Sequence, residues 1–383
     1  MNLLAWPGLD PALLVRDGES EAPFPLNAVH ATYFFRARNA IYHLFRCLGL
    51  GPDAPVLVPS YHSGNEIEAI RAAGASLRFY GIDRQLEPDL DEIVRLCRQE
   101  PRPRVLFCIH FLGWPQPIEA LTKICREYDL ILVEDCALAM LSEREGRPLG
   151  SFGDYAVFCM YKTVPIPNGG LLVQNEHVIE ALESMKMKPG SLISVNGRLC
   201  DLLLARRNGS NHLRDAAMAF KQGISKRLSA FGVPRTPIGE IGFDINRVDL
   251  AMSKVSRRLL RTFDYDNIRR RRRENFLQLQ SSLQGRAAFI EKPLQEGVCP
   301  LFFPLLVADK TSAAKALQDC GIGTIEFWNT TPAGPNEGGD VAFLRRHVLE
   351  LPIHQDVTSE QISYMAEKVL NLGLGWSGPT LDN

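Results

Sequence analysis

From Arg36 to Gln174, segments in which apolar residues recur at helical spacing alternate with segments of strand-like spacing. Apolar residues between Ala40 and Leu48 recur at helical spacing and stop before Gly49, a residue typical of helix C-caps. Continuous apolar runs at 104–111 and 130–135 indicate strands that are buried on both faces. This order of elements predicts an α/β fold in which helices cover both faces of a mostly parallel sheet.

The remaining pattern completes this domain. We expect strands at 56–60, 76–82, 154–160 and 170–175, a helix over 64–73 that ends at Gly74, and another helix after the Pro115–Pro117 turn. Residues 197–231 carry two amphipathic, basic helical stretches, which we interpret as a connector within the large domain.

Beyond Gly242 the pattern predicts a smaller α+β domain. A long helix that contains Arg269 to Arg273 precedes a strand at 302–308, a helix at 311–319 and a final helix from Ser359 to Leu370. The five arginines are interpreted as a solvated helix face, while a role at a subunit boundary or beside a phosphate-bearing substrate stays open. The predicted division is an N-terminal arm at 1–30, a large domain at 31–245 and a small domain at 246–383.

Composition narrows the possible partners. Among 383 residues, 43 basic and 44 acidic side chains give a formal charge of −1, so no overall field attracts nucleic acid or anionic lipid. Charges interrupt every apolar run before the ~20 residues that a membrane span requires, and the first residues do not resemble a secretory signal, so we expect a cytoplasmic protein. Nine cysteines without a C-x-x-C pair predict neither disulfides nor a metal site.

Two residues carry candidate chemistry. Asp135 ends a buried strand, where open α/β sheets bind their ligands, and a carboxylate there can keep a pyridine nitrogen protonated. Lys162 follows the apolar strand at 154–160, and a shielded amine is a competent Schiff-base nucleophile and base. Taken singly, Asp135 fits a helix cap or ion pair and Lys162 a solvated lysine. Together they match what pyridoxal 5′-phosphate (PLP) needs: an anion at its ring nitrogen and an amine at its aldehyde.

The chain resembles the DegT/StrS family of PLP-dependent aminotransferases from about Arg36 to its C-terminus. The stretches that carry the resemblance appear in the family's order: VLVPSY (56–61), AGASLRFYGID (73–83), IHFLG (109–113), VEDCA (133–137), GRPLGSFGD (146–154), NGG (168–170), RRRENF (271–276) and LPIHQD (351–356). The resemblance implies a fold-type-I transferase and a homodimer whose active sites lie at the subunit interface.

The resemblance also implies roles for individual residues. Lys162 matches the lysine that forms the internal aldimine, and Asp135 matches the aspartate at the pyridine nitrogen. Ala37, Arg38 and Asn39 match the small turn that binds the cofactor phosphate at the start of the first helix, where free N–H groups favour an anion.

Several positions depart from the family pattern. Cys159 best matches the serine that holds the phosphate, and Leu138 stands where a glutamine or histidine usually touches the ring. Ser63 replaces the aromatic residue that stacks on the cofactor, with His62 or Tyr61 as possible substitutes. Asp244 falls at an asparagine that reaches the phosphate from the neighbouring subunit.

Three other residues lie in candidate positions. His110 and His354 fall within family landmarks, where a histidine is more often a core or hinge residue than a catalyst. Trp328 either reaches the substrate entrance or packs between the domains.

The hypothesis from the sequence is amino transfer in two half-reactions. An amino-acid donor, by resemblance glutamate or glutamine, converts PLP to its amino form, and a keto-sugar, by resemblance nucleotide-linked, then accepts the nitrogen. Two alternatives stay open. One is a PLP enzyme of altered reaction, such as a dehydratase or a transferase to a non-sugar carbonyl. The other is a non-catalytic member that serves as a binding or assembly subunit.

Overall fold

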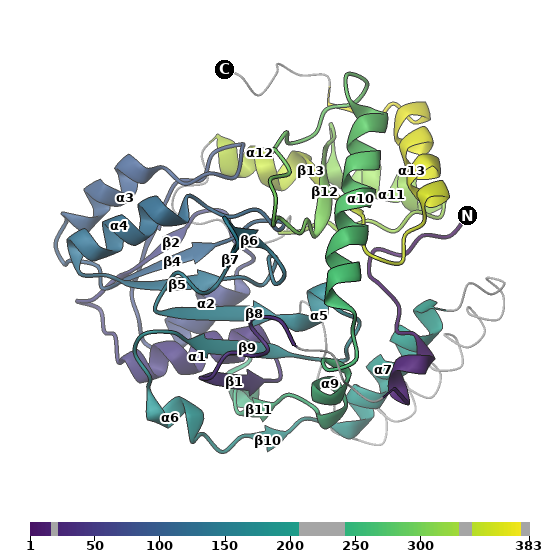
Figure 1. The fold of residues 1–383 in the computed structure, drawn as a ribbon. Coiled ribbons are helices and arrows are strands. Elements are labelled where there is room, and N and C mark those ends of the chain that lie inside the picture. The colour runs from purple at the N-terminus through teal and green to yellow at the C-terminus, as the bar shows by residue number, and fades with distance from the viewer. Residues whose placement is uncertain (17–21, 207–241, 329–338, 377–383) are drawn as a thin grey trace.

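A nine-stranded sheet forms the centre of the large domain in the computed structural model, which describes residues 1–16, 22–206, 242–328 and 339–376 (Figure 1). The strand order is β10-β11-β1-β9-β8-β5-β4-β2-β3. The strands are β1 (Ala31–Phe34), β2 (Val56–Pro59), β3 (Leu77–Tyr80), β4 (Val105–Ile109), β5 (Ile131–Asp135), β8 (Tyr155–Cys159), β9 (Gly170–Gln174), β10 (Lys188–Pro189) and β11 (Leu250–Ala251).

Five neighbouring strands, β8, β5, β4, β2 and β3, are parallel, as the apolar runs predict, whereas β9 pairs antiparallel with β8 and β1. The register sets Ile109 beside Asp135, and Asp135 beside Val157. The carboxyl ends of β4, β5 and β8 therefore meet at one edge of the sheet, the edge that binds ligands in α/β folds.

Helices cover this sheet. They are α1 (Ala37–Leu48), α2 (Asn65–Ala72), α3 (Leu90–Cys97), α4 (Ile118–Tyr128), α5 (Met160–Thr163), α6 (Glu180–Glu183), α7 (Leu192–Arg206) and α9 (Lys254–Leu259). As predicted, α1 ends at Gly49, which adopts a left-handed φ of 64° that favours glycine. Helix α7 begins before the predicted connector and contains its first ten residues; residues 207–231 lie outside the described part. Among the described helices, none has the length and apolar character to cross a bilayer.

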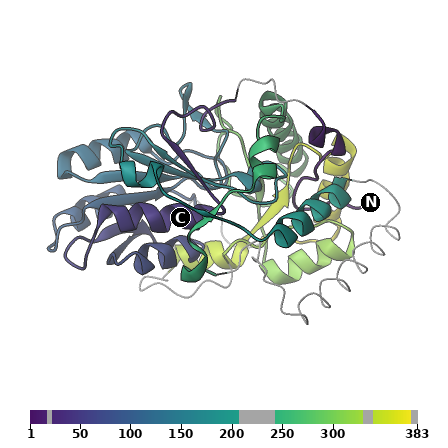
Figure 2. The ribbon, with the colours of Figure 1, turned by 90° about the horizontal axis from the view of Figure 1, so that it is seen from below.

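The small domain packs α10 (Tyr265–Leu283) against α13 (Ser359–Asn371). Its other elements are the antiparallel strands β12 (Phe302–Leu306) and β13 (Val348–Pro352) and the helices α11 (Lys310–Asp319) and α12 (Asp340–His347). The N-terminal segment lies beside this domain (Figures 1 and 2). Leu3 pairs with Ile322 in a parallel bridge, and Gly8 N–H donates to Asp356.

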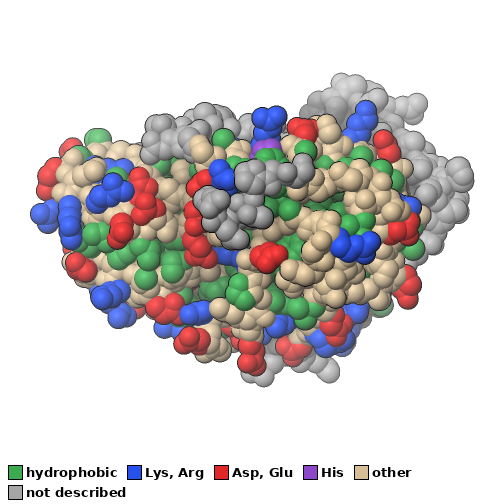
Figure 3. Space-filling view, turned by 90° about the horizontal axis from the view of Figure 1, so that it is seen from above, with side chains coloured by type: hydrophobic (Ala, Val, Ile, Leu, Met, Phe, Trp, Pro, Cys, Tyr) green, Lys and Arg blue, Asp and Glu red, His purple; other side chains and the backbone are tan. Residues whose placement is uncertain are grey.

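The large sheet extends beyond residue 245, the predicted end of the large domain, because strand β11 pairs with β1 through Phe34 and Ala251. On the face shown in Figure 3, acidic and basic side chains are interspersed, as the formal charge of −1 leads one to expect.

The arginine run of α10 is not simply a solvated face. Arg272 is 1% exposed and donates to the carbonyls of Leu301 and Thr163, and Arg269 pairs with Glu143 at 2.6 Å. The helical spacing turns one arginine of the run into the core, where backbone carbonyls satisfy it. Arg272 therefore joins the small domain to the end of α5, the helix that carries Lys162.

Candidate active site

A pocket of about 560 Å³, partly open to solvent, lies at the carboxyl ends of β4, β5 and β8. Its walls combine the start of α1, the turn before α2, the strand ends and one small-domain residue. They are Arg36, Ala37, Arg38, Ile41, Ser63, Asn65, Glu66, Ile109, Asp135, Ala137, Leu138, Cys159, Tyr161, Lys162 and Trp328.

Asp135 and Lys162 share this pocket. Asp135 is the last residue of β5 and is 6% exposed; its Oδ1 accepts the Ala137 N–H at 2.8 Å. Lys162 lies on the single-turn helix α5, directly after β8, with its Nζ 5.3 Å from the ring centroid of Phe327. Two neighbouring parallel strands thus bring together the two residues that the sequence singled out.

The Asp135 carboxyl is poised to meet a cation. Burial, reinforced by the charge of Glu66, raises its pKa from 3.8 to about 7, although the Ala137 N–H and the Lys162 ammonium oppose the rise. A protonated ring nitrogen beside Asp135 would favour its ionised form by supplying an opposite charge.

The other end of the pocket attracts an anion. Arg36 caps the N-terminus of α1 and is 9% exposed, and its Nη2 finds no hydrogen-bond partner among the described residues. Burial, followed by the charge of Arg38, lowers the pKa of Arg36 to about 10. A buried guanidinium at a helix N-terminus is a favourable site for a phosphate.

Gly170 makes this arrangement possible. A Cβ at Gly170 would lie 2.1 Å from the Arg36 carbonyl carbon, closer than any real contact. Gly170 also pairs with Cys159 across β8 and β9. The NGG motif therefore lets the start of α1 approach the strand that leads to Lys162.

Arg38 lies beside Arg36 on the pocket wall. Its Nη1 donates to Asn65 Oδ1 at 2.6 Å, and Asn65 lies at the start of α2. Ser63 also lines the pocket; its N–H and hydroxyl both donate to the Glu66 carboxylate, an arrangement that begins α2. The position at which the family has a stacking aromatic ring thus carries a hydroxyl that is bonded to Glu66.

Cys159 directly precedes the helix of Lys162, and Tyr161 lies within that helix. Both line the pocket, and their side chains are hydrogen-bonded to each other. Burial raises the pKa of the Cys159 thiol and of the Tyr161 hydroxyl, so both are neutral donors near pH 7. Tyr161 brings a phenolic O–H close to Arg36 and Arg38, and it was not predicted from the sequence.

Leu138 and Trp328 provide apolar walls. Leu138 is 2% exposed, and Trp328 packs edge-on against Tyr61 with ring centroids 4.5 Å apart. Trp328 therefore lines the pocket and packs against the large domain. Tyr61 itself contacts Phe111 and Trp328 and is not part of the pocket wall.

Three selected residues lie outside the pocket wall. Asn39 donates its side-chain amide to the carbonyls of Arg247 and Val248 and so holds a loop. His62 is 3% exposed and packs against Phe79; burial lowers its pKa to about 4. Asp244 accepts from the N–H of Asn246 in a partly exposed turn.

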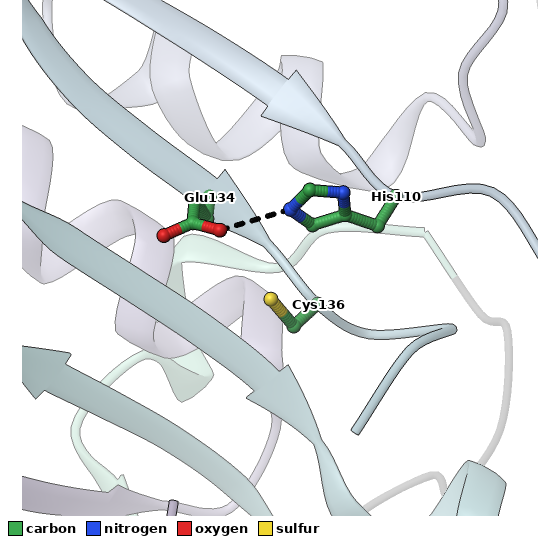
Figure 4. A group of neighbouring side chains, drawn as sticks. All are labelled: His110, Glu134 and Cys136. Atoms are coloured by element: carbon green, nitrogen blue, oxygen red, sulfur yellow. Dashed lines mark hydrogen bonds and ion pairs between the residues drawn. The ribbon is translucent and has the colours of Figure 1, made fainter. Parts of the chain in front are cut away.

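His110 belongs to a buried network centred on Glu134 (Figure 4). The Gln116 N–H donates to His110 Nδ1, so Nε2 carries the proton and donates to Glu134 Oε2 at 3.0 Å. Glu134 also accepts the N–H groups of Gly150, Phe152 and Gly153. The Cys136 Sγ lies within 4.8 Å of a ring nitrogen of His110 and of a carboxylate oxygen of Glu134.

These bonds give the group a structural role. The two Glu134 oxygens accept four hydrogen bonds, which is the usual capacity of a carboxylate, so none remains for a metal ion. The network fixes the loop at 150–153 against β5, one residue before Asp135. His354 is likewise structural: it is buried, its Nε2 bonds the Leu4 carbonyl at 3.0 Å, and burial lowers its pKa to about 3.

The residues that line the pocket fit pyridoxal phosphate. The unpartnered guanidinium atom of Arg36 at a helix N-terminus matches a phosphate, the buried Asp135 matches a ring nitrogen, and Lys162 matches an aldehyde. Among the polar side chains of the pocket wall, those of Arg36, Asn65, Glu66 and Tyr161 were not predicted from the sequence. Only the positions of Arg36 and Tyr161, adjacent to Ala37 and Lys162, offered a signal.

A large, mostly parallel sheet with a smaller α+β domain at its edge is the architecture of fold-type-I transferases. Two solved structures share it over nearly their whole length: PseC of Helicobacter pylori (TM-score 0.68, 14% identity, 97% of this chain and 98% of that chain) and TlmJ of Streptoalloteichus hindustanus (TM-score 0.65, 19% identity, 97% and 98%). Both are described as aminotransferases. The predicted fold is confirmed.

The chain belongs to the DegT/DnrJ/EryC1/StrS aminotransferase family, whose model matches residues 25–370. It is 30% identical over 169 residues to the dTDP-4-dehydro-2,3,6-trideoxy-D-glucose 4-aminotransferase of Saccharopolyspora spinosa, an alignment that covers 43% of each chain. It is 27% identical over 164 residues to the GDP-perosamine synthase of Vibrio cholerae, which covers 42% of this chain and 44% of the relative. These alignments span less than half of the relatives' length. The family expected from the sequence is confirmed.

Proposed function

We propose that this protein is a PLP-dependent aminotransferase that moves an amino group from glutamate or glutamine to a nucleotide-linked keto-sugar. The observation that carries the proposal is the meeting of Lys162 and Asp135 in one pocket, beside the arginines at the start of α1. The two relatives named above act on dTDP-linked and GDP-linked sugars by their names, which supports this substrate class.

Each pocket residue has a role in this proposal. Pyridoxal phosphate, when bound, supplies an aldehyde that captures amines and a ring that withdraws electrons. Arg36 and Arg38 would hold its phosphate, and Asp135 would keep the ring nitrogen protonated. The Lys162 amine would hold the aldehyde and, once displaced by the donor, would serve as the base that takes the donor's α-proton. Trp328 and Leu138 exclude water from the reacting atoms.

The same pocket supports a second reaction of this cofactor. Leu138 places an aliphatic side chain on the pocket wall where the family usually has a glutamine or histidine. A dehydration, or transfer to a non-sugar carbonyl, would use Lys162 and Asp135 in the same way. Product analysis by mass spectrometry, with several nucleotide-linked keto-sugars as acceptors, separates these reactions.

The experiment that tests the cofactor is an absorption spectrum of the purified protein followed by titration with glutamate. We expect a band of the lysine-bound cofactor that glutamate removes, and its absence in Lys162→Ala. Identical spectra for the two proteins, without such a band, would refute the proposal and favour a non-catalytic binding role.

We also propose a cytoplasmic homodimer with shared active sites, as the family resemblance implies. Light scattering of the purified chain measures its mass in solution. A mass twice that of the 42.8 kDa chain supports the dimer, and a monomer that turns over substrate contradicts it.

A further inference from the structure

Among the described residues of the small domain, the segment from Ile325 to Trp328 reaches the pocket. Trp328 lines the pocket wall, and the Phe327 ring lies with its centroid 5.3 Å from Lys162 Nζ. Phe327 is 1% exposed. An ammonium over an aromatic face is attracted by the ring, and the ring also keeps water from the amine. The position of Phe327 therefore bears directly on Lys162.

A buried ion pair holds the backbone of Phe327. Lys310, the first residue of α11, and Glu350, in the middle of β13, are 2% and 1% exposed, and their charged atoms lie 3.3 Å apart. Lys310 Nζ donates to the Phe327 carbonyl at 2.7 Å, and the Phe327 N–H donates to Glu350 Oε2 at 3.1 Å. The pair thus bonds the N–H and the carbonyl of one residue.

The backbone of Glu350 reinforces this hold. Its N–H and carbonyl exchange hydrogen bonds of 3.1 and 3.0 Å with Ile325, two residues before Phe327. A buried ion pair is a poor source of stability, because desolvation of both charges offsets their attraction and an apolar pair often serves as well. Its hydrogen bonds do, however, fix one backbone conformation.

We propose that Lys310 and Glu350 are positioning residues that act on Lys162 through Phe327. They hold the Phe327 ring against the amine, so that the amine is shielded from water and keeps one orientation toward the pocket. The role in catalysis rests on the function proposed above, but the contact itself can be tested without a cofactor.

The test is competitive acetylation of the full-length chain after dialysis to remove any cofactor. Trace acetic anhydride modifies unprotonated, accessible amines, and mass spectrometry reports the rate at Lys162 relative to the other lysines. In Phe327→Leu we expect Lys162 to react about two- to fivefold faster, the factor that corresponds to losing a cation–π contact of ~0.5–1 kcal/mol. In Lys310→Met we expect the same increase, because Phe327 is then no longer held.

The double variant gives the sharpest result. If Lys310 acts through Phe327, combining the two substitutions adds nothing to either one. A Lys310→Met rate equal to that of the wild type, an unchanged rate in Phe327→Leu, or additive effects would overturn the proposal. Should Lys310→Met fail to fold, Glu350→Met removes the acceptor of the Phe327 N–H, and an unchanged rate there would also overturn the proposal.

Lys292→Met is the matched control. Lys292 pairs with Glu87 at 2.5 Å, a contact between the two domains, and neither residue lines the pocket. Its loss should leave the Lys162 rate unchanged. Because labelling requires no cofactor, a chain that binds no pyridoxal phosphate still reports these rates, so failure of this inference and failure of the proposed function are distinguishable.

Discussion

The Asp135 carboxyl and the Lys162 amine occupy one pocket, and the ammonium charge lowers the pKa of Asp135 against the stronger effect of burial. They come from successive strand ends of a parallel sheet, β5 and β8. The proposed cofactor needs two groups from the protein. One is a buried acid that can pair with a positive charge, and the other is an amine that can bind an aldehyde.

Asp135→Asn should alter how stability depends on pH. Because burial raises the pKa of Asp135 to about 7, its contribution to the cofactor-free fold is full below pH 3.8 and is lost as pH rises through 7. Asparagine does not titrate. The free energy of unfolding of the variant, relative to that of the wild type, should therefore rise between pH 4.5 and pH 8.5, by on the order of 4 kcal/mol at most. Denaturant unfolding at both pH values measures the difference.

The exposed Asp319 provides the control, since Asp319→Asn should show no such trend. Burial also raises the pKa of Glu350 to about 7. Glu350 is present in both proteins, so its contribution to the pH dependence cancels in the difference between variant and wild type. A stability difference between Asp135→Asn and wild type that does not change with pH would contradict the assigned burial of the charge.

Arg36→Met should weaken cofactor binding. Removing a charged hydrogen bond of ~1.5–3 kcal/mol corresponds to at least a tenfold higher Kd for pyridoxal phosphate, and Arg38→Ala should act in the same direction. Equilibrium dialysis measures both. Arg46→Met, in the exposed last turn of the same helix, should bind as the wild type does. A Kd for Arg36→Met within twofold of the wild type would show that the phosphate is held elsewhere.

Glu134→Gln should destabilise the fold. One carboxylate oxygen becomes an NH₂ donor that faces N–H donors, so at least one buried hydrogen bond is replaced by a clash, at a cost of about 3 kcal/mol. Urea unfolding compares it with Glu145→Gln, whose side chain is 79% exposed in the nearby turn and which should be neutral. Equal midpoints for both variants would be inconsistent with the network of His110 and Glu134.

The Asp135–Lys162 pair could be predicted from the sequence. The hydrophobic periodicity predicts parallel strands, and the carboxyl ends of parallel strands lie at the same edge of a sheet. The sequence did not identify Arg36, whose burial depends on the close approach of Gly170 from a distant strand. Arg272 was misjudged for a similar reason. Its charge predicts exposure, whereas the carbonyls of Leu301 and Thr163, which allow its burial, meet only in the folded chain.

The direction in which a side chain points could not be predicted from the sequence either. Asn39 and His62 adjoin pocket residues in the sequence, yet the turn of α1 and the path of the 60–65 loop point them toward Val248 and Phe79. Phe327 and its partners Lys310 and Glu350 come from separate elements of the small domain, and no motif links them. Local spacing predicts which strand end carries chemistry, and tertiary packing decides which neighbours face it.

Covalent trapping of the cofactor on Lys162 tests the central claim most directly. The chain is incubated with pyridoxal phosphate, reduced with borohydride, digested and examined by mass spectrometry. We expect one phosphopyridoxyl group on the peptide that contains Lys162, and no such group in Lys162→Ala. Modification spread over exposed lysines with Lys162 unmodified, or no stable adduct at all, would contradict it.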